Sequence, residues 1–142
     1  MGQVRFEGVR IQLADLQGLF FHASFVHAPE VLRVLHPGLE SNPGHAIWQR
    51  DFSGASGLFS VVLKPVPQKA VNAFLDALTL FGMGFSWGGY ESLAIWFDCA
   101  EYRTATRWSP GGPTLRFHIG LEDVGDLITD LERGFAALAA AQ

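Results

Sequence analysis

Thr114-Leu-Arg-Phe-His-Ile119 is the stretch that decides the fold, because apolar and polar side chains alternate along it. A period of two predicts a strand with one covered face and one open face. The face predicted to be covered carries Leu115, Phe117 and Ile119. Arg116 and His118 share the other face, and Gly120 ends the strand.

A helix is predicted directly after this strand. Asp123 can accept hydrogen bonds from the free N–H groups of a first helical turn. Beyond it, apolar residues recur at the three- and four-residue spacing of a helix that packs on one side. They are Val124, Leu127, Ile128, Leu131, Phe135 and Leu138.

The rest of the chain supplies more strands and helices of moderate length. Strands are predicted at Val31–Leu35, at Leu58–Leu63, where Phe59, Val61 and Leu63 share one face of a half-buried strand, and at Ser92–Phe97. A short helix is predicted up to Arg50, and a longer one between Pro67 and Leu80. This order predicts an α+β fold, a small and mostly antiparallel sheet with helices packed on one face.

The N-terminal part differs in character from the remainder of the chain. Apolar residues at helical spacing predict a helix over Val9–Val26, and its second face, with Phe21, Phe25 and Val26, is almost uncharged. Either burial within this domain or contact with a partner would account for that face equally well. We therefore expect residues 1–28 to form a linking helix and residues 29–142 to form the domain.

The composition excludes several classes of protein. The chain has 142 residues, 49% of them hydrophobic, and a net charge of −4 with ten Lys and Arg residues, which does not favour binding to nucleic acid. Cys99 is the only cysteine, so the chain can form no internal disulfide. The sequence shows neither an apolar run of membrane-spanning length nor a signal-peptide pattern, and a soluble cytoplasmic protein is expected.

Two motifs could be read as catalytic, and both fit poorly. Ser53-Gly-Ala-Ser-Gly57 is similar to the nucleophile elbow of hydrolases, but Leu58 stands where the elbow requires a glycine. A glycine-rich loop explains the stretch better, although an independent hydrolase using Ser56 is a third, weaker hypothesis. The five histidines and Cys99 have no metal-ligand spacing, and no metal site is predicted.

Arg116 and His118 are the more promising pair, because alternate strand residues lie about 7 Å apart on one face. A guanidinium on a rigid strand can hold a carboxylate through two parallel hydrogen bonds. The spacing of the two residues is also compatible with a solvated sheet face or with a structural ion pair.

Three segments in order carry a resemblance to a known family: Arg50-Asp-Phe-Ser-Gly-Ala-Ser-Gly-Leu-Phe59, Phe85-Ser-Trp-Gly-Gly-Tyr-Glu-Ser-Leu93 and Leu115-Arg-Phe-His-Ile-Gly-Leu-Glu-Asp-Val124. The chain resembles the C-terminal domain of the cysteine/methionine-metabolism family of fold-type-I pyridoxal-phosphate enzymes. Trp87 and His118 make it most similar to the cystathionine β-lyase branch of that family. A γ-lyase or γ-synthase small domain is the alternative within the family.

The resemblance implies a composite site that needs a second domain. Arg116 matches the arginine that holds the α-carboxylate of a sulfur amino acid, and Ser86 and Trp87 match residues of the substrate pocket. The reaction implied is cleavage of L-cystathionine to homocysteine, pyruvate and ammonia, a step of transsulfuration and methionine biosynthesis. Pyridoxal 5'-phosphate is the cofactor, and family enzymes are usually homo-oligomers.

The lysine that binds pyridoxal phosphate in this family has no match here. Lys64 stands at a strand end and Lys69 in the first turn of a helix. We therefore expect no catalytic residue in this chain and no activity of the chain alone. The hypothesis is a fragment that works with the missing cofactor-binding domain, and the alternative is a non-catalytic remnant or assembly module.

Overall fold

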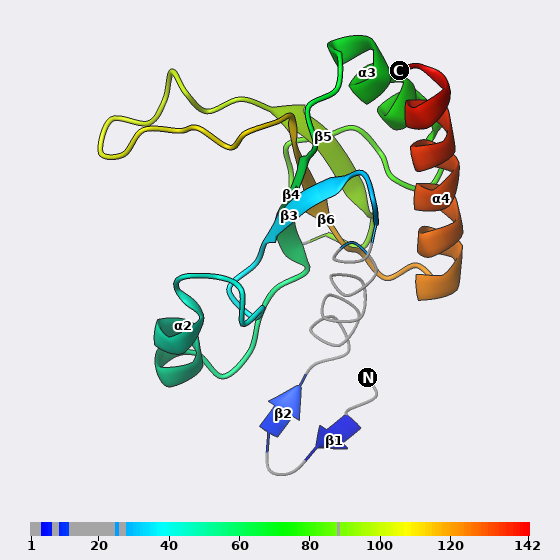
Figure 1. Ribbon diagram of the computed structural model, residues 1–142. Helices are drawn as coiled ribbons and strands as arrows, with labels where there is room; N and C mark the ends of the chain where they lie inside the picture. Colours follow the sequence, from blue (N-terminus) through cyan, green and yellow to red (C-terminus); the bar gives the residue numbers. More distant parts are fainter. Residues whose placement is uncertain (1–3, 7–8, 12–24, 26–27, 88) are drawn as a thin grey trace.

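The computed structural model describes residues 4–6, 9–11, 25, 28–87 and 89–142 (Figure 1). Its main sheet has four antiparallel strands in the order β3-β4-β6-β5. The strands are β3 (Val31–Leu35), β4 (Leu58–Leu63), β5 (Leu93–Phe97) and β6 (Thr114–His118). The helices are α2 (His45–Asp51), α3 (Gln68–Ala77) and α4 (Val124–Ala140).

The core lies between one face of the sheet and helices α3 and α4, which lie on the same side of it (Figure 1). Phe117 in the centre of that face is fully buried and contacts the rings of Phe59, Phe74 and Phe81. These rings meet at offset or edge-on angles, which is the favourable geometry for aromatic pairs. The arrangement confirms the predicted α+β fold with helices on one face.

Helices α3 and α4 approach closely because Gly134 has no side chain. A Cβ atom at this position would lie 2.9 Å from the Phe74 ring and 3.0 Å from Leu78. The predicted cap at the start of α4 is confirmed, since the Asp123 side chain accepts hydrogen bonds from the N–H groups of Gly125 and Asp126. Sequence therefore determines both where α4 begins and how near α3 it lies.

The second face of the sheet is less polar than the alternation predicts. Val62 is fully buried, although it alternates with Val61 and Leu63 of the core face and so belongs to the second face. The register explains the difference, because Val62 lies between Arg33 of β3 and Thr114 of β6, whose side chains flank it. The strand predictions themselves are confirmed, with ends that differ by at most one residue.

The helix predicted over Val9–Val26 is wrong at its start, whereas Phe25 near its predicted end is helical. Val9–Ile11 is strand β2, which pairs antiparallel with β1 (Val4–Phe6), whereas a helix was predicted from Val9. In both segments apolar residues alternate with an arginine, and this period of two competes with the helical spacing that begins further on.

Of the two explanations left open for the uncharged face, burial within this domain holds for Phe25. It is 1% exposed and packs against Phe59, Phe117 and Phe135 inside this domain. Phe21 and Val26 lie outside the described residues. The predicted boundary between residues 28 and 29 stays a prediction.

Candidate functional site

Arg116 lies in the middle of β6, on the sheet face opposite to α3 and α4. Its neighbours across the strands are Ser60 of β4 and Ile95 of β5. The Nη2 atom donates a hydrogen bond of 2.7 Å to the carbonyl oxygen of Phe85, and the guanidinium lies 5.8 Å from the centre of the Phe85 ring. Arg116 forms no ion pair with any described residue. A structural ion pair therefore does not explain this arginine.

The Arg116 side chain borders a hollow of about 380 Å³. Most of its wall is aromatic, and its only charged residues among those described are Arg116 and Asp98. The lining residues are Phe85, Ile95, Trp96, Phe97, Asp98, Tyr102 and Arg116. A guanidinium with free N–H donors in an aromatic hollow is suited to a small ligand that carries a carboxylate.

Ser86 and Trp87 follow Phe85 directly but are not among the residues that line this hollow. Both are exposed, and Trp87 is 66% exposed. The structure therefore brings Arg116 together with Phe85, and it leaves the predicted binding roles of Ser86 and Trp87 untested.

His118 shares the Arg116 face but is 8% exposed, so it is less open than an alternating strand predicts. Its Nε2 atom lies 3.2 Å from the carbonyl oxygen of Gly89. Together, Arg116 and His118 hold the two ends of the segment from Phe85 to Gly89 against β6. One face of β6 thus positions the segment that contains Ser86 and Trp87.

Glu122, after β6, and Ser92, before β5, are joined by hydrogen bonds that the sequence did not predict. The Glu122 carboxylate accepts hydrogen bonds from the Ser92 N–H at 2.8 Å and from the Ser92 hydroxyl at 2.7 Å. Burial alone would raise the pKa of Glu122, but these bonds and the charge of nearby His118 outweigh it and lower the pKa. Because the two residues are thirty positions apart, no local motif indicates this contact.

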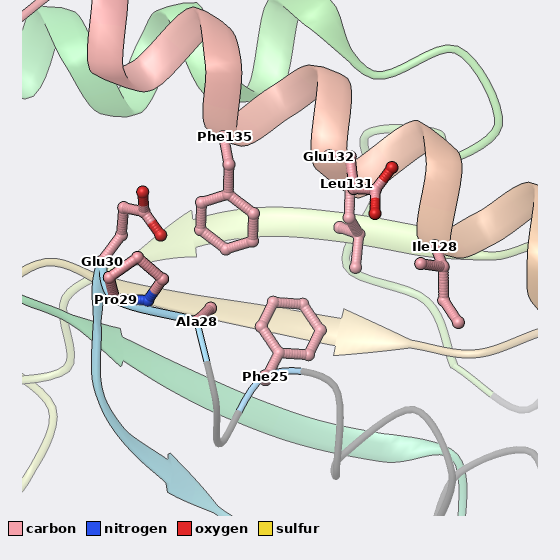
Figure 2. Close-up of a pocket in the computed structure, with 8 residues that line it drawn as sticks. All are labelled: Phe25, Ala28, Pro29, Glu30, Ile128, Leu131, Glu132 and Phe135. Carbon is pink, nitrogen blue, oxygen red and sulfur yellow. The ribbon is translucent and has the colours of Figure 1, made fainter.

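A second hollow, of about 360 Å³, lies between α4 and the segment that includes Phe25 and Glu30. Figure 2 shows Phe135 and Leu131 pointing from α4 toward the Phe25 ring. Arg116 does not line it, and neither does any described residue between Phe85 and Gly89. This hollow is therefore separate from the candidate site.

The hydrolase hypothesis finds no support around Ser56. The Ser56 hydroxyl oxygen accepts a hydrogen bond from the Leu58 N–H at 3.3 Å. His36 lines one hollow together with Ser56, but its Nδ1 accepts a hydrogen bond from the Gly38 N–H and its ring bonds to the Ser56 backbone. A serine nucleophile requires a base directed at its hydroxyl, and His36 does not have that orientation.

Neither a metal site nor a membrane helix is found within the described ranges. No group of three or more His, Cys, Asp or Glu side chains there could hold a metal ion. Among the same residues, no helix has the length and apolar character needed to cross a bilayer.

Comparison with solved structures places this fold among the fold-type-I pyridoxal-phosphate enzymes. The cystathionine gamma synthase of Xanthomonas oryzae pv. oryzae superposes with a TM-score of 0.77 and 30% identity, over 91% of this chain and 34% of that one. A model of the Cys/Met metabolism PLP-dependent enzymes matches residues 8–136, and the chain belongs to that family.

The sequence relatives include two bacterial cystathionine beta-lyases. The chain is 46% identical to the cystathionine beta-lyase of Salmonella typhimurium over 136 residues, which cover 92% of this chain and 34% of the relative. It is 51% identical to the cystathionine beta-lyase of Bordetella avium over 104 residues, which cover 72% of this chain and 26% of the relative. The chain thus spans about a third or less of the length of these relatives.

The described residues do not form a site for pyridoxal phosphate, although the family depends on this cofactor. Lys64 and Lys69 are the two lysines of the chain, and both are exposed. Neither lines the hollow of Arg116. Arg116 is therefore suited to a carboxylate, but neither lysine lines its hollow to hold the cofactor there.

Proposed function

We propose that this chain is the part of a cystathionine β-lyase-type enzyme that binds the substrate α-carboxylate. The whole enzyme would cleave L-cystathionine, with uptake of water, to homocysteine, pyruvate and ammonia. Pyridoxal phosphate would supply the electron sink for this carbon–sulfur elimination, held by a domain that this chain does not contain. Within this chain, the proposed carboxylate-binding residue is Arg116. Ser86 and Trp87 are further candidates for substrate binding.

The observation that carries the proposal is the guanidinium of Arg116, which lies on a rigid strand and pairs with no acid among the described residues. Its bond to Phe85 uses one of its N–H groups and orients the planar group, so the remaining donors can receive both oxygens of a carboxylate. The β-lyase relatives at 46% and 51% identity support the choice of reaction.

The test is complementation with the lysine-bearing domain of a β-lyase relative, which is co-expressed with this chain. Release of pyruvate and of a thiol from L-cystathionine measures activity. Replacing Arg116 by Gln removes the charge, and we expect kcat/KM to fall roughly 10- to 100-fold, the value of hydrogen bonds to a charged group.

The matched control is Arg103→Gln, an exposed arginine that stacks on Trp108 and does not line the hollow. This variant should retain full activity. Equal losses in the two variants would contradict a specific role for Arg116. If no activity is restored although the two parts associate, the chain is a non-catalytic remnant or assembly module instead.

A further inference from the structure

Asp98 is the second charged group in the hollow of Arg116, and it is not neutralised there. Its Oδ1 atom accepts a hydrogen bond of 2.9 Å from the Ala100 N–H just after β5. No other described residue donates to this carboxylate, and it forms no ion pair. One hollow thus holds an unpaired cation and an unpaired anion, which is the complement of a ligand with both charges.

The strand register separates the two charges along the hollow. Ile95 lies directly opposite Arg116, and Asp98 follows three residues later, directly after the end of β5. Three residues of extended chain span roughly 10 Å. In an α-amino acid the ammonium and the carboxylate are attached to one carbon, so the α-ammonium cannot reach Asp98 while the α-carboxylate binds Arg116.

We infer that Asp98 binds the second ammonium group of a diamino, dicarboxylic thioether substrate. This inference rests on the proposed function, because it assumes that Arg116 holds the α-carboxylate. The thioether and methylene groups between the two charged ends then lie along the aromatic side chains of Phe97 and Tyr102. Sulfur and methylene groups pack favourably on aromatic rings.

Asp98 acts as a specificity-determining residue in this arrangement. A sulfur amino acid without a second amino group keeps its contact with Arg116 and leaves Asp98 solvated. The chain should therefore prefer L-cystathionine to S-(3-carboxypropyl)-L-cysteine, which has the same skeleton and both carboxylates but lacks the distal amino group.

The experiment measures binding of both compounds to the full chain by NMR, through the Nε–H signal of Arg116. We expect L-cystathionine to bind about three- to fivefold more tightly, as for a partly exposed ion pair. In Asp98→Asn the two affinities should become equal, with that for S-(3-carboxypropyl)-L-cysteine unchanged. Asparagine keeps an oxygen for the Ala100 N–H, so the turn after β5 is preserved.

Glu101→Gln is the control, because it removes a nearby exposed carboxylate that does not line the hollow. This variant should keep the preference. If the preference survives in Asp98→Asn or disappears in Glu101→Gln, the role of Asp98 is refuted while the role of Arg116 stands. If neither compound shifts the Arg116 signal, or if Arg116→Gln binds both as well as the native chain, the proposed function fails together with the inference.

Discussion

At the scale of single residues, Asp130 is the most important buried charge. Its side chain is 1% exposed and accepts hydrogen bonds from the N–H groups of Thr79 and Leu80. It also pairs with Arg133 one turn further along α4. Burial alone would raise the pKa of Asp130, but these bonds outweigh it and hold the pKa below its ordinary value. One carboxylate therefore fastens the end of α3 to α4.

We predict that Asp130→Asn lowers the free energy of unfolding by about 2 kcal/mol at pH 7. A carboxyl group with a lowered pKa in the folded state stabilises the fold above its ordinary pKa of about 3.9 and loses this effect as pH falls through the folded value. The difference between native chain and variant should therefore shrink below about pH 4. Urea unfolding followed by circular dichroism at pH 7, 4 and 3 measures it.

Asp76→Asn is the control, since Asp76 is an exposed acid on α3. It should leave stability within about 0.5 kcal/mol at each pH. Equal stability of Asp130→Asn and the native chain at pH 7 would show that the carboxylate contributes nothing beyond an amide.

The candidate site and Asp130 differ in how far sequence could predict them. Arg116 was predictable because alternation in its own strand places it opposite Phe117, and its role came from a family resemblance. The hydrogen-bond donors to Asp130 and Glu122 were not predictable, because they lie about fifty and thirty residues away along the chain. Such contacts depend on the tertiary fold, and no local spacing encodes them.

At the scale of elements, the segment that contains Ser86 and Trp87 is attached to the sheet at several points. Arg116 and His118 hold it from β6, and the Leu121 N–H donates to the carbonyl oxygen of Tyr90 at 2.8 Å. Gly120 makes this close approach possible, because a Cβ there would lie 2.2 Å from the Tyr90 oxygen.

We predict that Gly120→Ala pushes this segment away from the sheet and destabilises the chain by about 1–3 kcal/mol, the usual cost of an inserted methyl group. Hydrogen exchange should become faster at Ser92 and Leu121, whose N–H groups bond to Glu122 and Tyr90. Gly89→Ala is the control, since a Cβ there meets nothing within 4 Å. Unchanged protection of both amides in Gly120→Ala would contradict this attachment.

Element prediction succeeded where one periodicity was clear and failed where two overlapped. Thr114–His118 alternates strictly and Leu58–Leu63 is a short run rich in β-branched and other apolar residues, and both are strands. At Val9–Ile11 an alternating stretch is followed directly by a helical pattern. The prediction assigned these residues to the helix, but they form a strand. Alternation also did not indicate the burial of Val62, because burial on the second face of a sheet depends on the neighbouring strands.

At the scale of the whole molecule, the proposed substrate-binding groups lie in a hollow that no lysine of the described residues lines. The hollow of Arg116 lies on the sheet face that α3 and α4 do not cover, whereas those helices and the core lie on the other face. An enzyme that excludes water needs a second wall over such a face. In the family relatives, most of the chain length lies outside the part that matches.

We predict that the chain alone neither cleaves L-cystathionine nor forms a specific adduct with pyridoxal phosphate. Lys64 follows β4 and Lys69 lies in the first turn of α3, both exposed and away from Arg116. After borohydride reduction, mass spectrometry should find only labelling that rises with cofactor concentration without saturating. The double variant Lys64→Arg, Lys69→Arg sets the background. Saturable labelling of one lysine, accompanied by pyruvate release, would mean that this chain brings a lysine to the cofactor by itself, and its role would then be that of a complete small lyase.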